Sequence, residues 1–189
     1  MYEYIPTTSG IDSVRQRNTG LTLAVSGNTF FKYATTYFTS PAVIDTFFYS
    51  KDNAGNYFTI STPDFDFYPL FDSAGTLIQY PYLRSEVAAG TSWQTDSIGV
   101  KIGNDVGFAR ARLTVFQKGQ TRAVLGTTYT NVIRMKREIL FRRTNQTTFA
   151  VVEEGDSFYA PNVGLIDQSI ISGPTSIQSI SLRRSLIVP

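Results

Sequence analysis

The residues with the greatest catalytic potential are two aspartates two positions apart, Asp64 and Asp66, in the segment PDFDFY. On a strand both side chains would point to the same face. Paired carboxylates perform acid–base or glycosidic chemistry when their spacing and pKa values suit it. The neighbouring sequence offers no reaction partner, so we interpret this pair as charges that protect a sheet edge from aggregation. We therefore predict no catalytic residue in this chain.

The absence of histidine and cysteine narrows the possible chemistry further. It removes the usual general base, thiol nucleophiles and thiolate metal sites. Asp52, Asn53 and Asn56 surround Gly55, but the spacing departs from that of a calcium loop. The segment GNDVG lacks the Gly-Lys-Ser/Thr sequence of a phosphate loop. We expect no metal ion, no cofactor and no enzymatic activity.

A local excess of cations marks residues 131–143. On a strand, the even spacing of Arg134, Lys136 and Arg142 would place these side chains on one face. Arg110 and Arg112 could widen this face from a neighbouring strand. Such a surface would contact lipid headgroups or acidic glycan; the alternative is an ordinary solvated sheet face. The net charge of +2 gives no field typical of a nucleic-acid-binding protein.

The segment FYAPNVGLID predicts a sharp change of chain direction. Pro161 fixes its own φ angle, Asn162 is the type of non-glycine residue that best tolerates a positive φ, and Gly164 adopts one without strain. We therefore interpret Pro161, Asn162 and Gly164 as a structural turn. The alternative is a loop that contacts a ligand through Tyr159.

Aromatic residues make up 14% of the chain, and many gather in its first half. They could line a lipid-sized cavity in a half-barrel, but small barrels usually fill their interior with side chains, which is the interpretation favoured here. Trp93 is expected to anchor the core between the two halves of the sheet. The aromatic set is Phe30, Phe31, Tyr33, Tyr37, Phe38, Phe47, Phe48 and Tyr49.

Alternation with a period of two dominates the whole sequence and predicts an all-β domain with at most one helix. We expect a mostly antiparallel, curved sheet or incomplete barrel over residues 1–189, with two halves that meet near residues 84–92. Residues 42–61 read as one hairpin, and residues 117–120 as a turn. In residues 131–143 a strand is favoured over a helix, with Arg137 as the charged exception on an apolar face. A bulge or burial on both faces is expected near Arg112.

No apolar run is long enough for a transmembrane helix, and residues 1–10 lack the pattern of a signal peptide. Met1 is either a native start or an initiator placed ahead of a mature domain.

Three short motifs resemble those of a family of Bacteroidota cell-envelope lipoproteins. They are YIPTTSG (residues 4–10), AAGTSW (residues 88–93), and TYTNVIRMKRE followed by FYAPNVGLID. This chain has Asn162 where the family usually has glycine. The resemblance implies a β-rich protein of the periplasm or outer membrane, lipid-anchored in its native form through a processed N-terminal cysteine that this chain lacks.

The function expected from this resemblance is a non-enzymatic envelope lipoprotein domain with a binding or interaction role. Its expected partners are an anionic lipid, a glycan or another envelope protein, contacted through Arg134, Lys136, Arg142 and Tyr159. Two alternatives remain: a structural subunit of a virus, phage or envelope, and a glycan-active enzyme that depends on carboxylates. If the chain is a binding domain, we expect an apolar cavity. If it is a structural subunit, we expect a filled core, and if it is an enzyme, we expect carboxylates that converge on one place.

Overall fold

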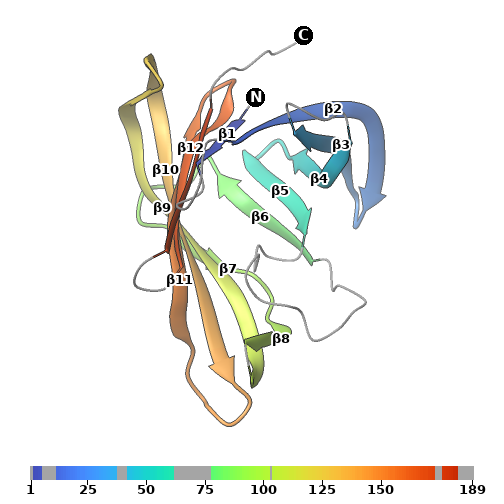
Figure 1. The fold of residues 1–189 in the computed structure, drawn as a ribbon, viewed down its shortest axis with the longest axis vertical. Coiled ribbons are helices and arrows are strands. Elements are labelled where there is room, and N and C mark those ends of the chain that lie inside the picture. The colour runs from blue at the N-terminus through green and yellow to red at the C-terminus, as the bar shows by residue number, and fades with distance from the viewer. Residues whose placement is uncertain are drawn as a thin grey trace.

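The computed structural model describes residues 2–5, 12–37, 42–61, 78–102, 104–172 and 176–182. These residues form thirteen strands, with no helix in any of the described ranges, so the predicted all-β class is confirmed. The strands (Figure 1) are β1 Tyr2–Ile5, β2 Asp12–Val25, β3 Asn28–Tyr37, β4 Val43–Lys51, β5 Asn56–Ser61, β6 Ile78–Arg84, β7 Ser92–Gln94, β8 Ile98–Ile102, β9 Asp105–Val124, β10 Thr127–Arg143, β11 Ala150–Ala160, β12 Gly164–Ser172 and β13 Ser176–Leu182.

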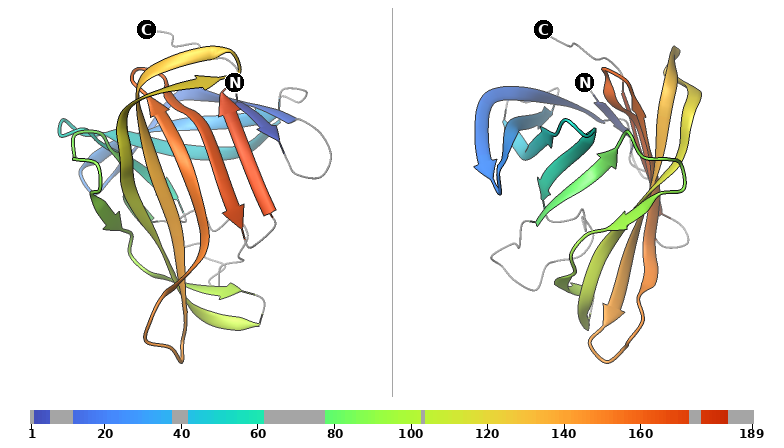
Figure 2. Two further views of the ribbon diagram at one scale, coloured as in Figure 1. Left: turned by 90° about the vertical axis from the view of Figure 1, so that its left-hand side faces the viewer. Right: turned by 180° about the vertical axis from the view of Figure 1, so that it is seen from behind.

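All thirteen strands belong to one antiparallel sheet. Its spatial order is β6–β5–β4–β3–β2–β1–β13–β12–β11–β10–β9–β7, and β8 also pairs with β9. Pairing of β1 with β13 joins the two ends of the chain in the middle of the sheet. The sheet bends there, so that β2–β6 form one wall and β9–β12 form the other (Figures 1 and 2).

The two ends of the sheet, β6 and β7, are joined by side chains. The indole Nε1 of Trp93 on β7 donates a hydrogen bond of 2.6 Å to the carbonyl of Pro81 on β6. The Arg84 guanidinium lies over the Trp93 ring, 4.7 Å from its centroid. No strand pairing joins β6 to β7 among the described residues. The fold is therefore a curved, incomplete barrel, and Trp93 is the core anchor that the sequence predicted.

The core lies between strands β6–β8 and the segments 109–115 of β9 and 135–141 of β10. Along β9 the alternate residues Ala109, Ala111, Leu113 and Val115 are buried, which is the period-two pattern of a strand with one face in the core. The core is completed by residues of four neighbouring strands: Leu83, Trp93, Ile98, Val100, Met135, Ile139 and Phe141.

Residues 131–143 lie within β10, so the strand prediction is confirmed there, and β4 and β5 form the predicted hairpin. Neither the bulge nor the burial on both faces that was expected near Arg112 occurs, because β9 alternates without interruption from Ala109 to Val115 and the Arg112 side chain is 35% exposed. Phe108 lies instead on the outer face, with the Arg142 guanidinium over its ring. The pairing of β9 with β10 shifts register farther along, between Tyr129 and Met135 of β10.

The turn expected at residues 117–120 is also wrong. Strand β9 runs through this segment to Val124, and the turn occurs at Leu125 and Gly126, where φ is 47° and 83°. Residues 85–91 connect β6 to β7 and therefore cross from one end of the sheet to the other. In the described ranges no helix is long and apolar enough to cross a membrane.

Candidate ligand-binding cavity

A cavity of about 690 Å³ opens between the two walls of the sheet. Its lining combines residues of β2–β6 with residues of β9–β12 and the corner that joins β11 to β12. The interpretation that side chains fill the interior is therefore wrong. Four of the eight aromatics of that prediction line the cavity, namely Phe31, Tyr33, Phe47 and Tyr49; Phe38 and the side chain of Tyr37 lie outside the described part of the chain.

Among the described residues that line the cavity, tyrosine is the most frequent type, with six side chains. The rings of Tyr33 and Tyr49 meet edge to face, with their centroids 5.4 Å apart. The rings of Tyr49 and Tyr82 meet in the same way, with their centroids 5.6 Å apart. Tyr82 then reaches Tyr159 at 6.0 Å, so the ring contacts run from β3 to β11. Rings that meet at their edges leave faces for a ligand to pack against. The full set is Tyr33, Tyr49, Tyr57, Tyr80, Tyr82 and Tyr159.

The cavity has an exposed rim and a buried floor. We call Phe31, Asp45 and Lys51 the rim: all three are exposed, and the exposed fraction of Phe31 is 47%. We call Leu113, Met135, Arg137 and Ser157 the floor: Leu113, Met135 and Ser157 are buried, and the Arg137 side chain is 15% exposed. A ligand would enter past Phe31 and end near Arg137.

Arg137 brings a charge to this floor. Its Nη2 donates a hydrogen bond of 2.8 Å to Oε1 of Glu153 on β11, a side chain that is only 1% exposed. Gly155 lies opposite Arg137 in the β10–β11 register, and a Cβ at Gly155 would meet the backbone oxygen of Ser169 at 2.4 Å. Glycine at this position therefore permits close strand packing beside the ion pair. A buried charge requires such a partner, because desolvation without one is costly.

Thr35 also lies in the lining, on β3. Its hydroxyl oxygen is buried and has no hydrogen-bond partner among the described residues. Most buried hydroxyls in proteins are paired with protein or water. A polar atom of a ligand or a water molecule in the cavity would supply the partner that Thr35 lacks.

The corner after β11 is both a turn and part of the cavity wall. Asn162 has a φ of 60° and Gly164 a φ of 91°, and the Val163 amide donates to the carbonyl of Ala160 at 3.2 Å. These features agree with the predicted turn at Pro161, Asn162 and Gly164. Val163, Gly164 and Leu165 nevertheless line the cavity, as does Tyr159. The structure thus places Tyr159 where it could contact a ligand, and that role stays a prediction.

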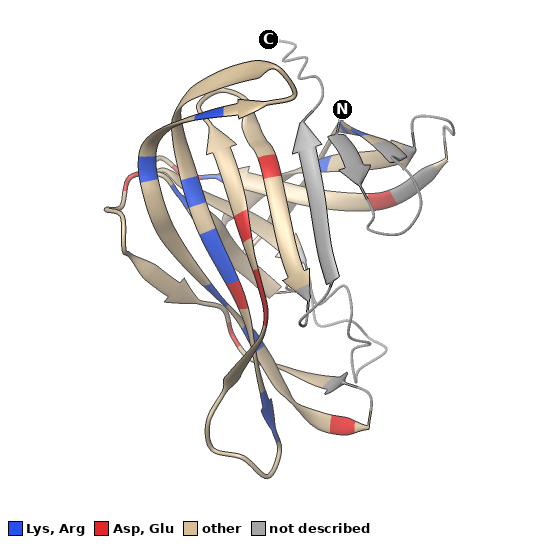
Figure 3. Ribbon diagram, turned by 60° about the vertical axis from the view of Figure 1, so that its left-hand side comes forward, with Lys and Arg blue, Asp and Glu red and all other residues tan. Residues whose placement is uncertain are grey.

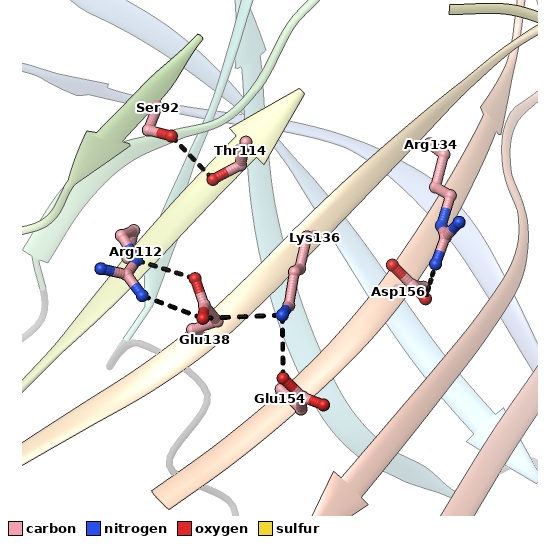
Figure 4. Close-up of polar contacts among 8 residues, drawn as sticks. All are labelled: Ser92, Arg112, Thr114, Arg134, Lys136, Glu138, Glu154 and Asp156. Atoms are coloured by element: carbon pink, nitrogen blue, oxygen red, sulfur yellow. Dashed lines mark hydrogen bonds and ion pairs between the residues drawn. The ribbon is translucent and has the colours of Figure 1, made fainter. Parts of the chain in front are cut away.

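The predicted basic face lies on the outer side of β10, away from the cavity (Figure 3). Arg134 donates to Asp156 at 2.6 Å. Lys136 Nζ lies 2.9 Å from Glu154 and 3.6 Å from Glu138 (Figure 4). The hydrogen bond to Asp156 raises the pKa of Arg134, and the hydrogen bond to Glu154 is the main cause of the raised pKa of Lys136.

Arg142 lies on the same outer face, between two aromatic rings. It donates to the backbone oxygen of Gln146 at 2.6 Å, and its guanidinium is 5.1 Å from the Phe108 ring centroid and 5.3 Å from that of Phe149. The three predicted cations therefore share a face, as their spacing indicated, but carboxylates alternate with two of them. Their binding to an anionic lipid or glycan stays a prediction.

The other candidate sites bring little chemistry together. Asp52 Oδ1 accepts hydrogen bonds from the backbone amides of Ala54 and Asn56, both at 2.9 Å, so this carboxylate closes the β4–β5 turn. The hydrogen bond from the Asn56 side chain is the main cause of the lowered pKa of Asp52. No group of three or more potential metal ligands exists among the residues that the structure describes. Asp64 and Asp66 lie outside the described residues.

Sequence reasoning missed the floor of the cavity. Arg137 appeared only as an exception in an otherwise apolar strand face, and that exception was the signal: a charged residue in phase with Met135 and Ile139 must be buried with them. The partner, Glu153, could not be found in the same way, because its pairing depends on the register of β10 with β11.

Comparisons with known proteins add a likeness in fold. No protein-family model matches the chain, and no curated protein matches it. The fold is similar to the crystal structure, at 2.70 Å resolution, of a "putative lipoprotein" from Parabacteroides distasonis ATCC 8503. The two chains are 13% identical and superimpose with a TM-score of 0.51 over 96% of this chain and 90% of the other. At this identity the likeness concerns the fold alone.

Proposed function

We propose that this chain is a cell-envelope lipoprotein domain that binds a small molecule with a largely apolar body between the two walls of its sheet. The cavity of about 690 Å³ is the observation that carries the proposal. Its volume lies within the range of about 300–1,000 Å³ that is typical of small-molecule sites. Among the described residues, aromatic and aliphatic side chains make up more than half of its lining, and polar side chains such as Gln16, Thr35 and Gln168 lie among them.

The envelope setting is supported by two independent likenesses. The motifs of the sequence resemble those of Bacteroidota envelope lipoproteins, and the fold is similar to a Parabacteroides protein that is described as a "putative lipoprotein". We propose a location in the periplasm or at the outer membrane, with a lipid anchor in the native form. Sequencing the genomic region upstream of Met1 tests this setting: a signal peptide that ends in cysteine is expected.

The absence of enzymatic activity is part of the same proposal. Among the described residues that line the cavity, Asp45 is the one carboxylate, and it lies at the exposed rim. Acid–base hydrolysis of a glycan normally needs two carboxylates that flank the reacting bond. The lining therefore favours binding over hydrolysis, and an open cavity favours a binding domain over a structural subunit with a filled core.

Titration with the neutral fluorophore N-phenyl-1-naphthylamine tests the binding function. We expect saturable fluorescence enhancement with one site per chain, because the dye moves from water to an aromatic surface. Ser157→Phe places a ring at the floor of the cavity and should weaken the dye affinity at least about tenfold, which is about 1.4 kcal/mol. Ser157 is buried and lies in the lining.

Thr114→Phe is the matched control, because Thr114 lies on the outer face of β9, where its hydroxyl contacts that of Ser92 at 2.8 Å. This variant should bind the dye as the wild type does. Thermal melts of both variants establish that they are folded. If the wild type shows no saturable enhancement, or if both variants bind equally, the cavity is not a ligand site.

A further inference from the structure

The charges around the cavity are divided between its rim and its floor. At the rim, Lys51 and Asp45 are both exposed and opposite in sign, so their effects largely cancel and water screens them. At the floor, Arg137 is the charged residue in the lining, and its side chain is 85% shielded from solvent. The charge at the floor, rather than the charges at the rim, would therefore determine which ligand charge the cavity prefers, because water screens buried charges far less.

The counter-charge of Arg137 is hidden from the cavity. Glu153 is 1% exposed and does not appear in the lining, whereas Arg137 does. A ligand that reaches the floor therefore contacts the guanidinium and not the carboxylate. A guanidinium carries five N–H donors in a planar fork, so one arginine can serve acceptors on more than one edge. The bond from Nη2 to Glu153 is one of the contacts that orient the group.

Between rim and floor the lining suits a flexible apolar body. Phe47 and the linked rings of Tyr33, Tyr49, Tyr82 and Tyr159 cover this depth. Thr35 and Gln168 in the lining can each serve a water molecule or a single polar atom, whereas the ring faces of Phe47 and the tyrosines favour an apolar chain.

We infer that the ligand is a monocarboxylic amphiphile, with its carboxylate on Arg137 at the floor and its apolar chain along the tyrosines toward Phe31 at the rim. This inference rests on the proposed function and names the ligand class of the same cavity. A single negative charge fits better than a phosphate dianion, since Glu153 already neutralises part of the guanidinium charge.

Three ligands of equal chain length separate the head group from the apolar body: dodecanoic acid, dodecanol and dodecylamine. Each is used to displace N-phenyl-1-naphthylamine from the wild-type chain at pH 8, where the acid is ionised, and below micelle-forming concentrations. We expect the acid to bind about tenfold more tightly than the alcohol, because a charge-assisted hydrogen bond to a buried guanidinium is worth about that factor. The amine should bind most weakly.

The double variant Arg137→Gln, Glu153→Gln removes both charges without leaving either one buried alone. In this variant the acid and the alcohol should bind equally. The matched control is Arg112→Gln, Glu138→Gln, which removes an ion pair with bonds of 2.7 and 2.9 Å between β9 and β10, on the outer face of the sheet. The control should keep the preference for the acid.

The outcomes separate the inference from the proposed function. If the wild type binds the dye saturably and the acid and the alcohol displace it equally, the inference is overturned and the proposed function stands. The same conclusion follows if the dye binds but none of the three ligands displaces it. Absence of dye binding overturns both. A preference for the acid that persists in the Arg137 double variant, or disappears in the outer-face control, overturns the assignment to Arg137. The wild-type comparison decides the head-group preference even if the double variant does not fold.

Discussion

Glu138 shows how single residues organise the outer face of β10. Arg112 donates two hydrogen bonds to its carboxylate, and Lys136 lies 3.6 Å from it (Figure 4). The hydrogen bonds from Arg112 are the main cause of its lowered pKa. A group whose pKa is lower in the folded than in the unfolded state stabilises the fold above its unfolded pKa.

Glu138→Gln should therefore lower the free energy of unfolding at pH 7 by about 1 kcal/mol; Arg112 is about a third exposed, so solvent screening limits the effect. The stabilisation from Glu138 is complete above its unfolded pKa of about 4.3 and is lost as the pH falls through the lower folded pKa. Urea denaturation at pH 7, 5 and 3 should thus show a difference between wild type and variant that shrinks at pH 3. Glu154→Gln, at a more exposed carboxylate, is the control with a smaller effect. A difference that does not change with pH contradicts this account.

At the scale of elements, the corner between β11 and β12 links turn chemistry to the cavity. Asn162 and Gly164 both have positive φ angles, and a Cβ at Gly164 would meet no heavy atom within 4 Å. A side chain there would thus be unfavourable because of backbone strain and not because of a clash. The conformation of this corner sets the direction in which Leu165 enters the cavity wall.

Gly164→Val should lower the free energy of unfolding by about 1–3 kcal/mol, the usual cost of holding a branched residue at a strained φ. Asn162→Gly should leave stability nearly unchanged or raise it slightly, because glycine adopts a positive φ without strain. Gly99→Val in β8 is the control, since Gly99 has open space around it and no positive φ. Thermal melts measure all three variants. If Gly164→Val and Asn162→Gly both melt with the wild type, the corner does not have this conformation.

At the scale of the whole molecule, the cavity depends on how the two ends of one sheet are held. Tyr80 and Tyr82 belong to β6, at one end of the sheet, and line the cavity opposite β10 and β11. The hydrogen bond from Trp93 to Pro81 fixes β6 against β7. Because strand pairing does not join these ends in the described part of the chain, side-chain contacts determine the width of the cavity.

Trp93→Phe should therefore affect stability and ligand binding together. Loss of the hydrogen bond leaves the half-buried carbonyl of Pro81 without this donor, and the free energy of unfolding should fall by about 1–3 kcal/mol. Dye affinity should also fall, since β6 would be held less firmly. Urea denaturation and titration with N-phenyl-1-naphthylamine measure the two effects. Tyr129→Phe, on the β9–β10 hairpin away from both sheet ends, is the control. A variant that binds the dye normally despite lower stability would show that the Trp93 contact does not hold the cavity open.

The sequence by itself determined the features that depend on local patterns. Period-two alternation predicted the all-β class, because successive side chains of a strand point to opposite faces. The residue types at Pro161, Asn162 and Gly164 predicted the corner, because φ preferences are properties of single residues. At residues 117–120 the local pattern predicted a turn that does not occur, because pairing with β10 continues β9 through these turn-forming residues.

Only the tertiary structure decided where the cavity lies and which charges reach it. The aromatics of β3 and β4 line a cavity rather than fill a core because β1 pairs with β13, which bends the sheet and sets its two walls apart. Arg137 and Glu153 meet because of the register between β10 and β11, and Gly155 lets the adjoining strands pack closely there. Sheet bending and register depend on contacts between distant segments, whereas the sequence pattern records only the order of residues along one strand.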